Sequence, residues 1–331
     1  MSETVVETRH SEPYAEMMAR YLGPVVVQAF ANDDVTEIYV NPQEGRVHFD
    51  TRSQGRIQSE VHIDADRREM FLNAVASSLD VTLGPDHPRI EAELPTCAFR
   101  GSRLQGFVRP VTPSPAFNIR KPPTAIYSLD SYVTERMLTA SQRLELRRAI
   151  QERRNILIAG GTNSGKTTLA NALLKEITDL FPRERIVILE DTVELQCAGN
   201  DHLALRSCPA VSLEQLLKSA LRTSPNRIVV GEVRGAEALQ LLDAWATGHP
   251  GGVATVHASS AAGALSRLDR LAQRANVPPQ RELIAETIHL IVVIEGGSTG
   301  RRVTDLVTVT GLDERGRFLL RRASGQAIQQ E

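Results

Sequence analysis

The chain has 331 residues, with 38 lysine and arginine residues against 40 aspartate and glutamate residues. This length suffices for two domains that each bury a core, and the near-neutral charge excludes a broad basic field for nonspecific binding to nucleic acid or to an anionic membrane. Three cysteines without C-x-x-C spacing, Cys97, Cys197 and Cys208, favour reduced structural thiols over a disulfide framework or a zinc site.

The N-terminal segment as far as Met18 is acidic and polar, whereas a signal peptide has a basic start followed by an apolar stretch. The longest apolar runs, such as 25–27 and 290–294, are far shorter than the roughly 20 residues that cross a bilayer. We therefore expect a cytoplasmic protein, either soluble or attached peripherally to a membrane through protein partners.

The first third of the chain predicts a small α+β domain. Apolar residues recur at helical spacing over 15–32, and 66–79 has the pattern of an amphipathic helix. Short strand-like runs bounded by turn signals complete the domain. These expected strands are 35–40, 46–49, 103–108 and 117–120.

The domain boundary is expected at the sequence Lys121-Pro122-Pro123-Thr124. Proline lacks a backbone donor and restricts the residue before it, so this segment cannot continue regular structure. We place the interdomain linker there, which predicts an N-terminal domain over 1–124 and a second domain over 125–331.

From Thr139 onward, helical segments alternate with short apolar strands. This alternation predicts an α/β domain with a mainly parallel sheet covered by helices on both faces. Ser212 and Gln215 form a capping-box pattern, which predicts the start of one covering helix. The expected strands are 155–159, 185–189, 227–230, 253–256 and 290–294.

A phosphate loop is predicted at Gly160-Gly161-Thr162-Asn163-Ser164-Gly165-Lys166-Thr167, which matches G-x-x-x-x-G-K-[ST] between an expected strand and an expected helix. Small residues let backbone N–H groups converge on phosphate oxygens at a helix N-terminus. We expect this loop, together with Thr168, to bind ATP. Lys166 would reach the β and γ phosphates, and the hydroxyl of Thr167 would coordinate Mg²⁺. The alternative, a glycine-rich turn with a solvated lysine, is disfavoured by the strand-loop-helix context.

Three further clusters of polar residues follow the expected strands at 186–194, 227–235 and 247–258. Open parallel sheets bind their ligands at the carboxyl ends of strands. Taken singly, each cluster has an ordinary structural explanation, because acids at strand ends often cap helices and a single histidine is more often structural. Their order after a phosphate loop makes the combination more specific. The polar residues concerned are Glu190, Asp191 and Glu194, then Glu232, and finally His249, Thr255 and His257.

With these motifs the sequence resembles the secretion ATPase superfamily, which drives type II secretion, type IV pili and type IV secretion. Its Walker A motif is matched by GGTNSGKTT, its Asp box by ILEDTVEL, its glutamate-type Walker B motif by VVGEVRG, and its His box by TGHPGGVATVHA. Its N-terminal domain is matched by DVTEIYVNP, GSRLQGFVRP and FNIRKP. The TrbB-type ATPases of conjugal transfer are matched by ELPTCAFRGSRLQGFVRP, AFNIRKP, EDTVELQC and GEVRGAEAL.

The resemblance implies a RecA-like P-loop ATPase domain preceded by a smaller α+β domain that covers the nucleotide. It also implies a homohexameric ring at the cytoplasmic base of a type IV secretion channel, in contact with inner-membrane components. The chain lacks the four-cysteine zinc insertion that type II secretion ATPases usually carry. We therefore favour a motor for conjugation or type IV secretion, which drives pilus assembly or substrate transfer, over a type IV pilus assembly ATPase.

The resemblance also implies roles for residues of the second domain. Glu194 would orient or activate the attacking water, and Glu232 would hold Mg²⁺ through water. Asp191 is a weaker candidate for a metal contact. His249 and His257 would sense the γ-phosphate and link nucleotide occupancy to domain movement.

Arg103 and Arg120 of the first domain would reach the phosphates as arginine fingers, with surface salt bridges as the alternative. Arg234 is a weaker candidate. Arg301 lies outside every motif and is expected to have no part in turnover.

Other functional classes stay open on the sequence alone. A nucleotide-regulated switch would bind ATP with little hydrolysis, and a DNA-stimulated translocase would respond to DNA. The near-neutral charge does not indicate DNA contact. A small-molecule kinase is disfavoured because no lid or acceptor-site motif follows the Walker motifs.

Overall fold

The structure is a computed structural model that describes residues 4–123, 126–297, 300–322 and 327–328. The chain divides into two compact units, Met1–Thr124 and Ala125–Glu331, each with a sheet and a core of its own. Among the described residues, no helix combines the length and the apolar character that a membrane span requires.

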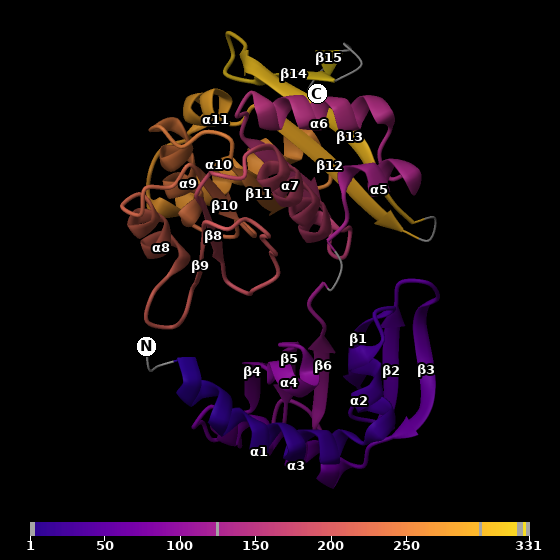
Figure 1. The fold of residues 1–331 in the computed structure, drawn as a ribbon. Coiled ribbons are helices and arrows are strands. Elements are labelled where there is room, and N and C mark those ends of the chain that lie inside the picture. The colour runs from indigo at the N-terminus through magenta and orange to yellow at the C-terminus, as the bar shows by residue number, and fades with distance from the viewer. Residues whose placement is uncertain (1–3, 124–125, 298–299, 323–326, 329–331) are drawn as a thin grey trace. The chain divides into compact units, whose positions relative to one another are not determined.

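The first unit is a six-stranded sheet with helices packed on it (Figure 1). The strands run in the order β3-β2-β1-β6-β5-β4, and every neighbouring pair is antiparallel. The helices are α1 (Thr4–Leu22), α2 (Pro24–Ala31), α3 (Ala65–Ser78) and α4 (Thr96–Phe99). The strands are β1 (Val35–Val40), β2 (Arg46–Thr51), β3 (Gly55–His62), β4 (Arg89–Glu93), β5 (Arg103–Phe107) and β6 (Ala116–Arg120).

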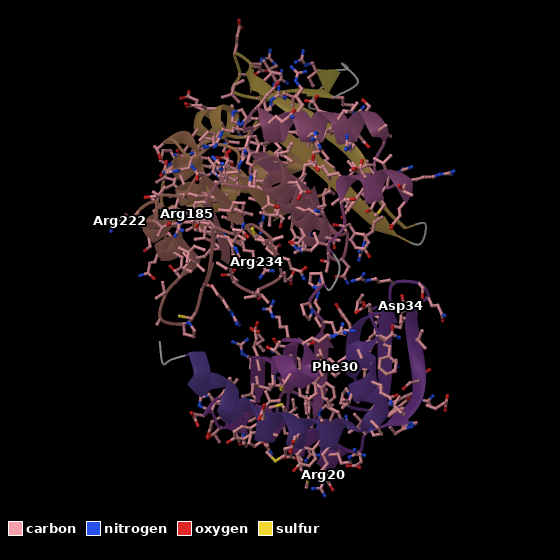
Figure 2. All side chains as sticks on the ribbon, in the orientation of Figure 1. Arg20, Phe30, Asp34, Arg185, Arg222 and Arg234 are labelled. Carbon is pink, nitrogen blue, oxygen red and sulfur yellow. The ribbon has the colours of Figure 1, made fainter. Side chains whose placement is uncertain are left out.

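The single helical pattern expected over 15–32 is two helices. Gly23 has a φ of 84°, which ends α1, and Pro24 begins α2 because its fixed φ suits the first helical position. Phe30 of α2, labelled in Figure 2, points into the core of this unit. Its ring packs edge-on against Phe99, with ring centroids 5.1 Å apart. The break between α1 and α2 therefore still leaves the apolar face of residues 15–32 buried.

The second unit is built on a nine-stranded sheet. Its helices are α5 (Leu129–Thr134), α6 (Ala140–Gln151), α7 (Lys166–Leu180), α8 (Leu213–Ala220), α9 (Glu237–Ala246), α10 (Ala261–Ala272), the 3₁₀ helix η1 (Gln273–Ala275) and α11 (Arg281–Thr287). Its strands are β7 (Ile156–Gly160), β8 (Ile186–Glu190), β9 (His202–Arg206), β10 (Arg227–Val230), β11 (Val253–His257), β12 (Leu290–Gly297), β13 (Gly300–Leu312), β14 (Phe318–Arg322) and β15 (Ala327–Ile328).

The strand order of this sheet is β15-β14-β13-β12-β7-β11-β10-β8-β9. The strands from β12 to β9 in this order pair in parallel, whereas β13, β14 and β15 are joined by antiparallel pairings. The predicted α/β class is confirmed, and the antiparallel strands at one edge are an addition that the sequence analysis did not anticipate.

Alternate residues of the central strands face two separate cores. Ile156 and Ile158 of β7 join the cluster that contains α5, α6 and α7. Leu157 and Ala159 join the cluster that contains α8, α9, α10 and α11. Helices therefore cover both faces of the sheet, as expected for strands that read as continuous apolar runs.

The loops that follow β7, β8, β10 and β11 all leave the sheet at the same end of its strands. The strands β7, β8, β10 and β11 are parallel, so their carboxyl ends meet. The capping box predicted for α8 is confirmed, since the Ser212 hydroxyl accepts from Gln215 N at 3.3 Å and the Gln215 side chain accepts from Ser212 N at 2.9 Å. The fold thus brings three separate stretches of sequence to the phosphate loop.

Candidate functional site

The phosphate loop joins the buried strand β7 to the first residue of α7. Asn163 and Gly165 have positive φ values of 58° and 98°, which turn the chain sharply into the helix. Lys166 is buried and donates from Nζ to the carbonyl oxygens of Gly160 at 3.0 Å and Gly161 at 2.7 Å. The lysine thus lies folded over its own loop.

The loop has features that suit a polyphosphate. A Cβ on Gly161 would meet no atom within 4 Å, so this part of the backbone is open to a ligand. The Ser164 hydroxyl is buried and has no hydrogen-bond partner among the residues that the structure describes. Together with the N-terminus of α7 and the Lys166 ammonium, these groups supply the donors that phosphate oxygens need.

The acidic segment after β8 is connected to the phosphate loop through Thr167. The Thr167 hydroxyl donates to Glu194 Oε2 at 3.0 Å. Asn171 of α7 donates to the Glu194 carbonyl at 3.1 Å and accepts from Gln196 N at 2.8 Å. The structure therefore places the predicted water-activating residue beside the predicted metal ligand.

Glu190 is a buried carboxyl that shapes this segment. Its Oε1 accepts from Glu194 N at 3.0 Å and from Leu195 N at 2.9 Å. Burial raises the pKa of Glu190 to about 7, although both hydrogen bonds act to lower it. A Cβ on Gly231 would lie 2.9 Å from Glu190 Cγ, so glycine is needed at this close approach.

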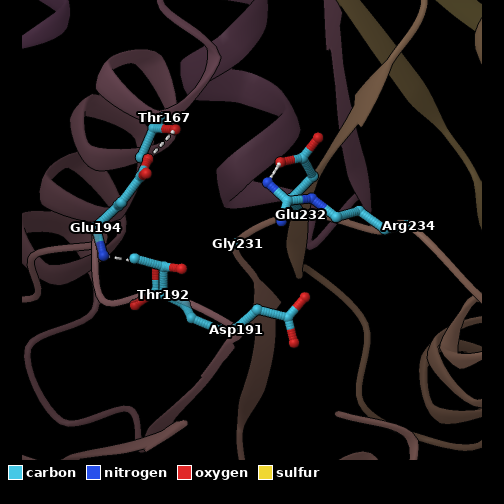
Figure 3. Close-up of a pocket in the computed structure, with 8 residues that line it drawn as sticks. Thr167, Asp191, Thr192, Glu194, Gly231, Glu232 and Arg234 are labelled. Atoms are coloured by element: carbon cyan, nitrogen blue, oxygen red, sulfur yellow. Dashed lines mark hydrogen bonds and ion pairs between the residues drawn. The ribbon is translucent and has the colours of Figure 1, made fainter. Parts of the chain in front are cut away.

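Glu232 follows β10 and is held by two basic side chains. Arg234 Nη2 donates to Glu232 Oε2 at 2.5 Å (Figure 3), and His257 Nε2 lies 2.9 Å from Oε1. Burial lowers the pKa of His257, and the nearby Lys166 charge adds to this effect. His257 lies at the end of β11, directly opposite Gly160 of β7.

A cavity of about 30 Å³ is lined by Thr167, Glu194 and Glu232, among other residues. Hydroxyl and carboxylate oxygens are the ligands that Mg²⁺ prefers, and this ion commonly keeps several waters beside one or two protein ligands. No cluster of three or more His, Cys, Asp or Glu residues in the described ranges is arranged to hold a metal. The residues present fit a metal held by Thr167, by water and by a phosphate ligand.

Two predicted residues do not contact the Thr167–Glu194 pair, although one of them, Asp191, lines the same cavity. Asp191 accepts from the Ser207 hydroxyl at 2.6 Å and points away from the Thr167–Glu194 pair (Figure 3). His249 precedes β11 and contacts the Pro225 carbonyl at 2.9 Å, ahead of β10. Because these strands are parallel, His249 lies at the amino ends of the strands, whereas the phosphate loop lies at their carboxyl ends. We therefore do not retain His249 as a γ-phosphate contact within its own chain.

Arg103 and Arg120 are brought together in the first unit. They face each other directly across the antiparallel strands β5 and β6. Arg103 is paired with Glu91, and Arg120 Nε lies 3.8 Å from Glu37 Oε1. Both arginines therefore lie on one face of this sheet with carboxylate neighbours.

Glu237 is a buried residue beside the site that the motifs in the sequence did not indicate. Its Oε1 accepts from Arg234 N at 2.6 Å and Gly235 N at 2.7 Å, so it fixes the segment after Glu232 as Glu190 fixes the segment before Glu194. The available signal was an acid in the first turn of α9, three residues after Arg234.

The chain also matches known proteins. The family model described as Type II/IV secretion system protein covers residues 13–297. The chain is 43% identical to the probable conjugal transfer protein TrbB of Sinorhizobium fredii over 288 residues, which cover 87% of each protein. It is 35% identical to the type IV secretion system protein PtlH of Bordetella pertussis, over 85% of this chain and 92% of PtlH.

A solved structure supports the fold. The ATPase DotB of Yersinia pseudotuberculosis matches with a TM-score of 0.64 and 18% identity, over 86% of this chain and 78% of DotB. At this identity the match concerns the fold alone. The family model and the curated relatives establish that the chain belongs to the Type II/IV secretion system protein family, among relatives of the TrbB conjugal transfer type.

Proposed function

We propose that this protein is the ATP-hydrolysing motor of a bacterial conjugation or type IV secretion system. The observation that carries the proposal is the convergence of a phosphate loop, Glu194 and the Glu232–His257 pair at one edge of a sheet. The names of its relatives, a conjugal transfer protein and a type IV secretion system protein, support the process assigned.

The second unit is proposed to be a RecA-like P-loop domain, supported by the parallel strands around β7 and the helices on both faces. Residues 160–168 would hold ATP, with Thr167 as a ligand of Mg²⁺. Bound MgATP supplies the γ-phosphoryl group and a metal that neutralises its charge. Lys166 would leave the Gly160 and Gly161 carbonyls and donate to phosphate oxygens instead.

Glu194 is proposed to orient the attacking water and to accept its proton. Its carboxylate lies on Thr167, which places it next to the phosphates that the loop would hold. Glu190 and Asn171 fix the backbone on each side of this carboxylate, so its position does not depend on the side chain alone. General-base catalysis requires such positioning within hydrogen-bond reach of the water.

Glu232 is proposed to orient water around the metal. Arg234 donates to one of its oxygens, and His257 Nε2 lies 2.9 Å from the other. His257 ends the strand next to the phosphate loop, so it is the histidine retained as a γ-phosphate sensor.

Arg103 and Arg120 are proposed to act as arginine fingers from the first unit. Their side chains share one face, and each has a carboxylate neighbour that phosphate oxygens would replace. Two guanidinium groups would stabilise the charge that spreads over the transferring phosphoryl group.

The protein is further proposed to form a homohexamer at the cytoplasmic face of the inner membrane, in contact with channel components. The names of the conjugal transfer and type IV secretion relatives support this location. A pilus assembly ATPase and a DNA-stimulated translocase are the alternatives. The net charge of −2 gives no indication of DNA contact.

The experiment that tests the proposal compares MgATP hydrolysis by the wild-type protein and Lys166→Ala. We expect activity in the wild type and activity below detection in the variant, because loss of a charge that stabilises the transition state costs about 3 kcal/mol or more. The oligomer, measured by light scattering, should persist in both. Hydrolysis by the variant within about twofold of wild type would remove the assignment, and strong stimulation of the wild type by DNA would favour the translocase.

A further inference from the structure

The hairpin formed by β12 and β13 lies against the phosphate loop. β12 pairs in parallel with β7, the strand that leads into the loop. A Cβ on Gly296 would lie 3.1 Å from Ser164 Cα and 3.2 Å from the Asn163 carbonyl oxygen, so the two backbones are in close contact. Arg301 of β13 is the residue directly opposite Gly296. The hairpin thus carries a cationic side chain to the loop.

Arg301 packs on Gly165, the residue that precedes α7. A Cβ on Gly165 would lie 2.9 Å from Arg301 Cδ and 3.3 Å from Nε. The side chain of Arg301 is half-buried. Gly165 therefore leaves the space in which the stem of Arg301 lies, and the guanidinium is held close to the loop backbone.

The surroundings of Arg301 are unfavourable for a cation. In the described part of the chain it forms no hydrogen bond or ion pair, whereas Arg322 of the neighbouring strand pairs with Asp305 at 3.1 Å. It lies at the N-terminus of α7, where the helix dipole is positive, and next to the residue that precedes Lys166. An anion bound at this position would remove the repulsion between these positive groups.

We propose that Arg301 is a nucleotide-binding residue whose guanidinium donates to phosphate oxygens of the nucleotide held in the loop. The inference rests on the proposed function, because it takes ATP as the ligand of this loop. Backbone N–H groups of a phosphate loop hold the α and β phosphates, so the contact at Gly165 is shared by ATP and ADP. Arginine suits this role because its fork of donors matches two phosphate oxygens at once.

The test measures dissociation constants for MgATP and MgADP with the full-length wild type, Arg301→Ala, Arg301→Lys and Arg302→Ala. Arg302 is the matched control, since adjacent strand residues point to opposite faces and its side chain is exposed. Arg301→Ala should weaken both nucleotides by roughly tenfold or more, the scale of a lost charge-assisted hydrogen bond. Arg301→Lys should recover part of this loss, and Arg302→Ala should bind within about twofold of wild type.

Thermal unfolding provides a second readout. Removal of a repelled cation should leave the melting temperature of nucleotide-free Arg301→Ala unchanged or raised, while the increase caused by MgADP becomes smaller. A merely structural Arg301 predicts the reverse, with a lower melting temperature for the nucleotide-free variant and an increase on MgADP binding like that of wild type. That reverse result would overturn the proposal.

The outcomes separate this inference from the proposed function. If the wild type binds MgATP and Arg301→Ala binds as tightly as Arg302→Ala, Arg301 has no role in binding and the proposed ATPase stands. If the wild type binds no nucleotide, the proposed function itself fails. Equal losses with MgATP and MgGTP support a phosphate contact, whereas a loss confined to MgATP would assign Arg301 to the base and overturn the phosphate assignment.

Discussion

Buried carboxylates that accept backbone N–H groups organise the two acidic segments of the site. Glu190 accepts from the backbone of Glu194, and Glu237 accepts from the backbone of Arg234, two residues after Glu232. Each of these carboxylates is close in sequence to the residue that it positions. The geometry of the proposed catalytic pair therefore depends on neighbours that touch no substrate.

Replacement of Glu190 tests this positioning. Glu190→Ala should lower kcat by roughly tenfold or more with a smaller change in nucleotide affinity, because the segment that carries Glu194 loses two hydrogen bonds. Glu190→Gln keeps an oxygen acceptor and should retain more activity. Glu176→Ala, which removes a buried acid of α7 that pairs with Arg147 of α6, is the control for general destabilisation. Equal losses in kcat for the Ala and Gln variants would contradict the positioning role.

Glu194 itself is tested by Glu194→Gln, which preserves shape and removes charge. We expect near-normal ATP affinity and a kcat reduced by on the order of a hundredfold, within the range for loss of a general base. Single-turnover phosphate release and equilibrium nucleotide binding measure the two quantities separately. A collapse of affinity with kcat preserved would show that Glu194 holds the nucleotide or metal instead.

Individual site residues differ in how well the sequence reveals them. Lys166 and Thr167 are predictable because the loop motif fixes both within a few residues of a strand and a helix. Glu237 makes local hydrogen bonds, and its place in the first turn of α9 is a signal that the sequence carries. Arg301 contacts the phosphate loop through the tertiary fold, so no spacing in the sequence indicates it. His249 was assigned with its box, but the box spans a whole strand and so reaches both edges of the sheet.

At the scale of elements, buried strands were predicted well and exposed ones were not. β1 and β10 have the predicted bounds, because continuous or alternating apolar residues mark strands that pack on a core. β3 and β9 lie at sheet edges with largely exposed side chains, and neither was expected. Polar edge strands give little hydrophobic signal, which explains their omission.

The end of β6 offers a test of pH dependence. Lys121 Nζ donates to the Ala29 carbonyl at 3.0 Å and the Asn32 carbonyl at 2.5 Å, which connects the strand to the C-terminus of α2. Burial lowers the pKa of Lys121 to about 8. The unfolded chain therefore binds more protons than the folded one between about pH 8 and the ordinary lysine pKa, so stability rises with pH across that window.

The measurement is urea unfolding of the wild type and Lys121→Met at about pH 7.5 and about pH 9.5. The free energy of unfolding of the wild type should rise relative to the variant between these values, by at most about 1.4 kcal/mol per pH unit for one proton. If the free energies of unfolding of the two proteins differ by the same amount at both pH values, Lys121 does not titrate in this range.

For the whole molecule, the division into two units predicts that the second can be studied alone. A shortened chain that begins at Tyr127 retains the sheet and both of its cores. It should fold and bind nucleotide through Lys166 and Thr167. It should hydrolyse ATP very slowly, because the charge on the transferring phosphoryl group lacks Arg103 and Arg120.

Single substitutions in the intact chain complete this test. Arg103→Ala and Arg120→Ala should reproduce much of the loss in kcat, and the exposed Arg302→Ala should not. The shortened chain and the three substituted proteins are compared with the intact wild type by kcat and by nucleotide affinity. If the shortened chain turns over as fast as the intact one, the first unit serves only for docking and the arginine assignment is lost.

In the structure the Lys166 ammonium donates to carbonyl oxygens of its own loop. These carbonyls therefore compete with the phosphate oxygens of a ligand for the same ammonium group. The proposed nucleotide would replace the Gly160 and Gly161 carbonyls as acceptors of the ammonium group with its phosphate oxygens. The measured affinity then reports how much more favourable the hydrogen bonds from Lys166 to phosphate are than its hydrogen bonds to the loop carbonyls. It does not report the full strength of the lysine–phosphate contact. Lys166→Ala removes the hydrogen bonds to the loop and those to phosphate together, so the two losses partly cancel in the binding affinity. Its effect on hydrolysis should be larger, because the charge stabilises the transition state more than the bound ground state.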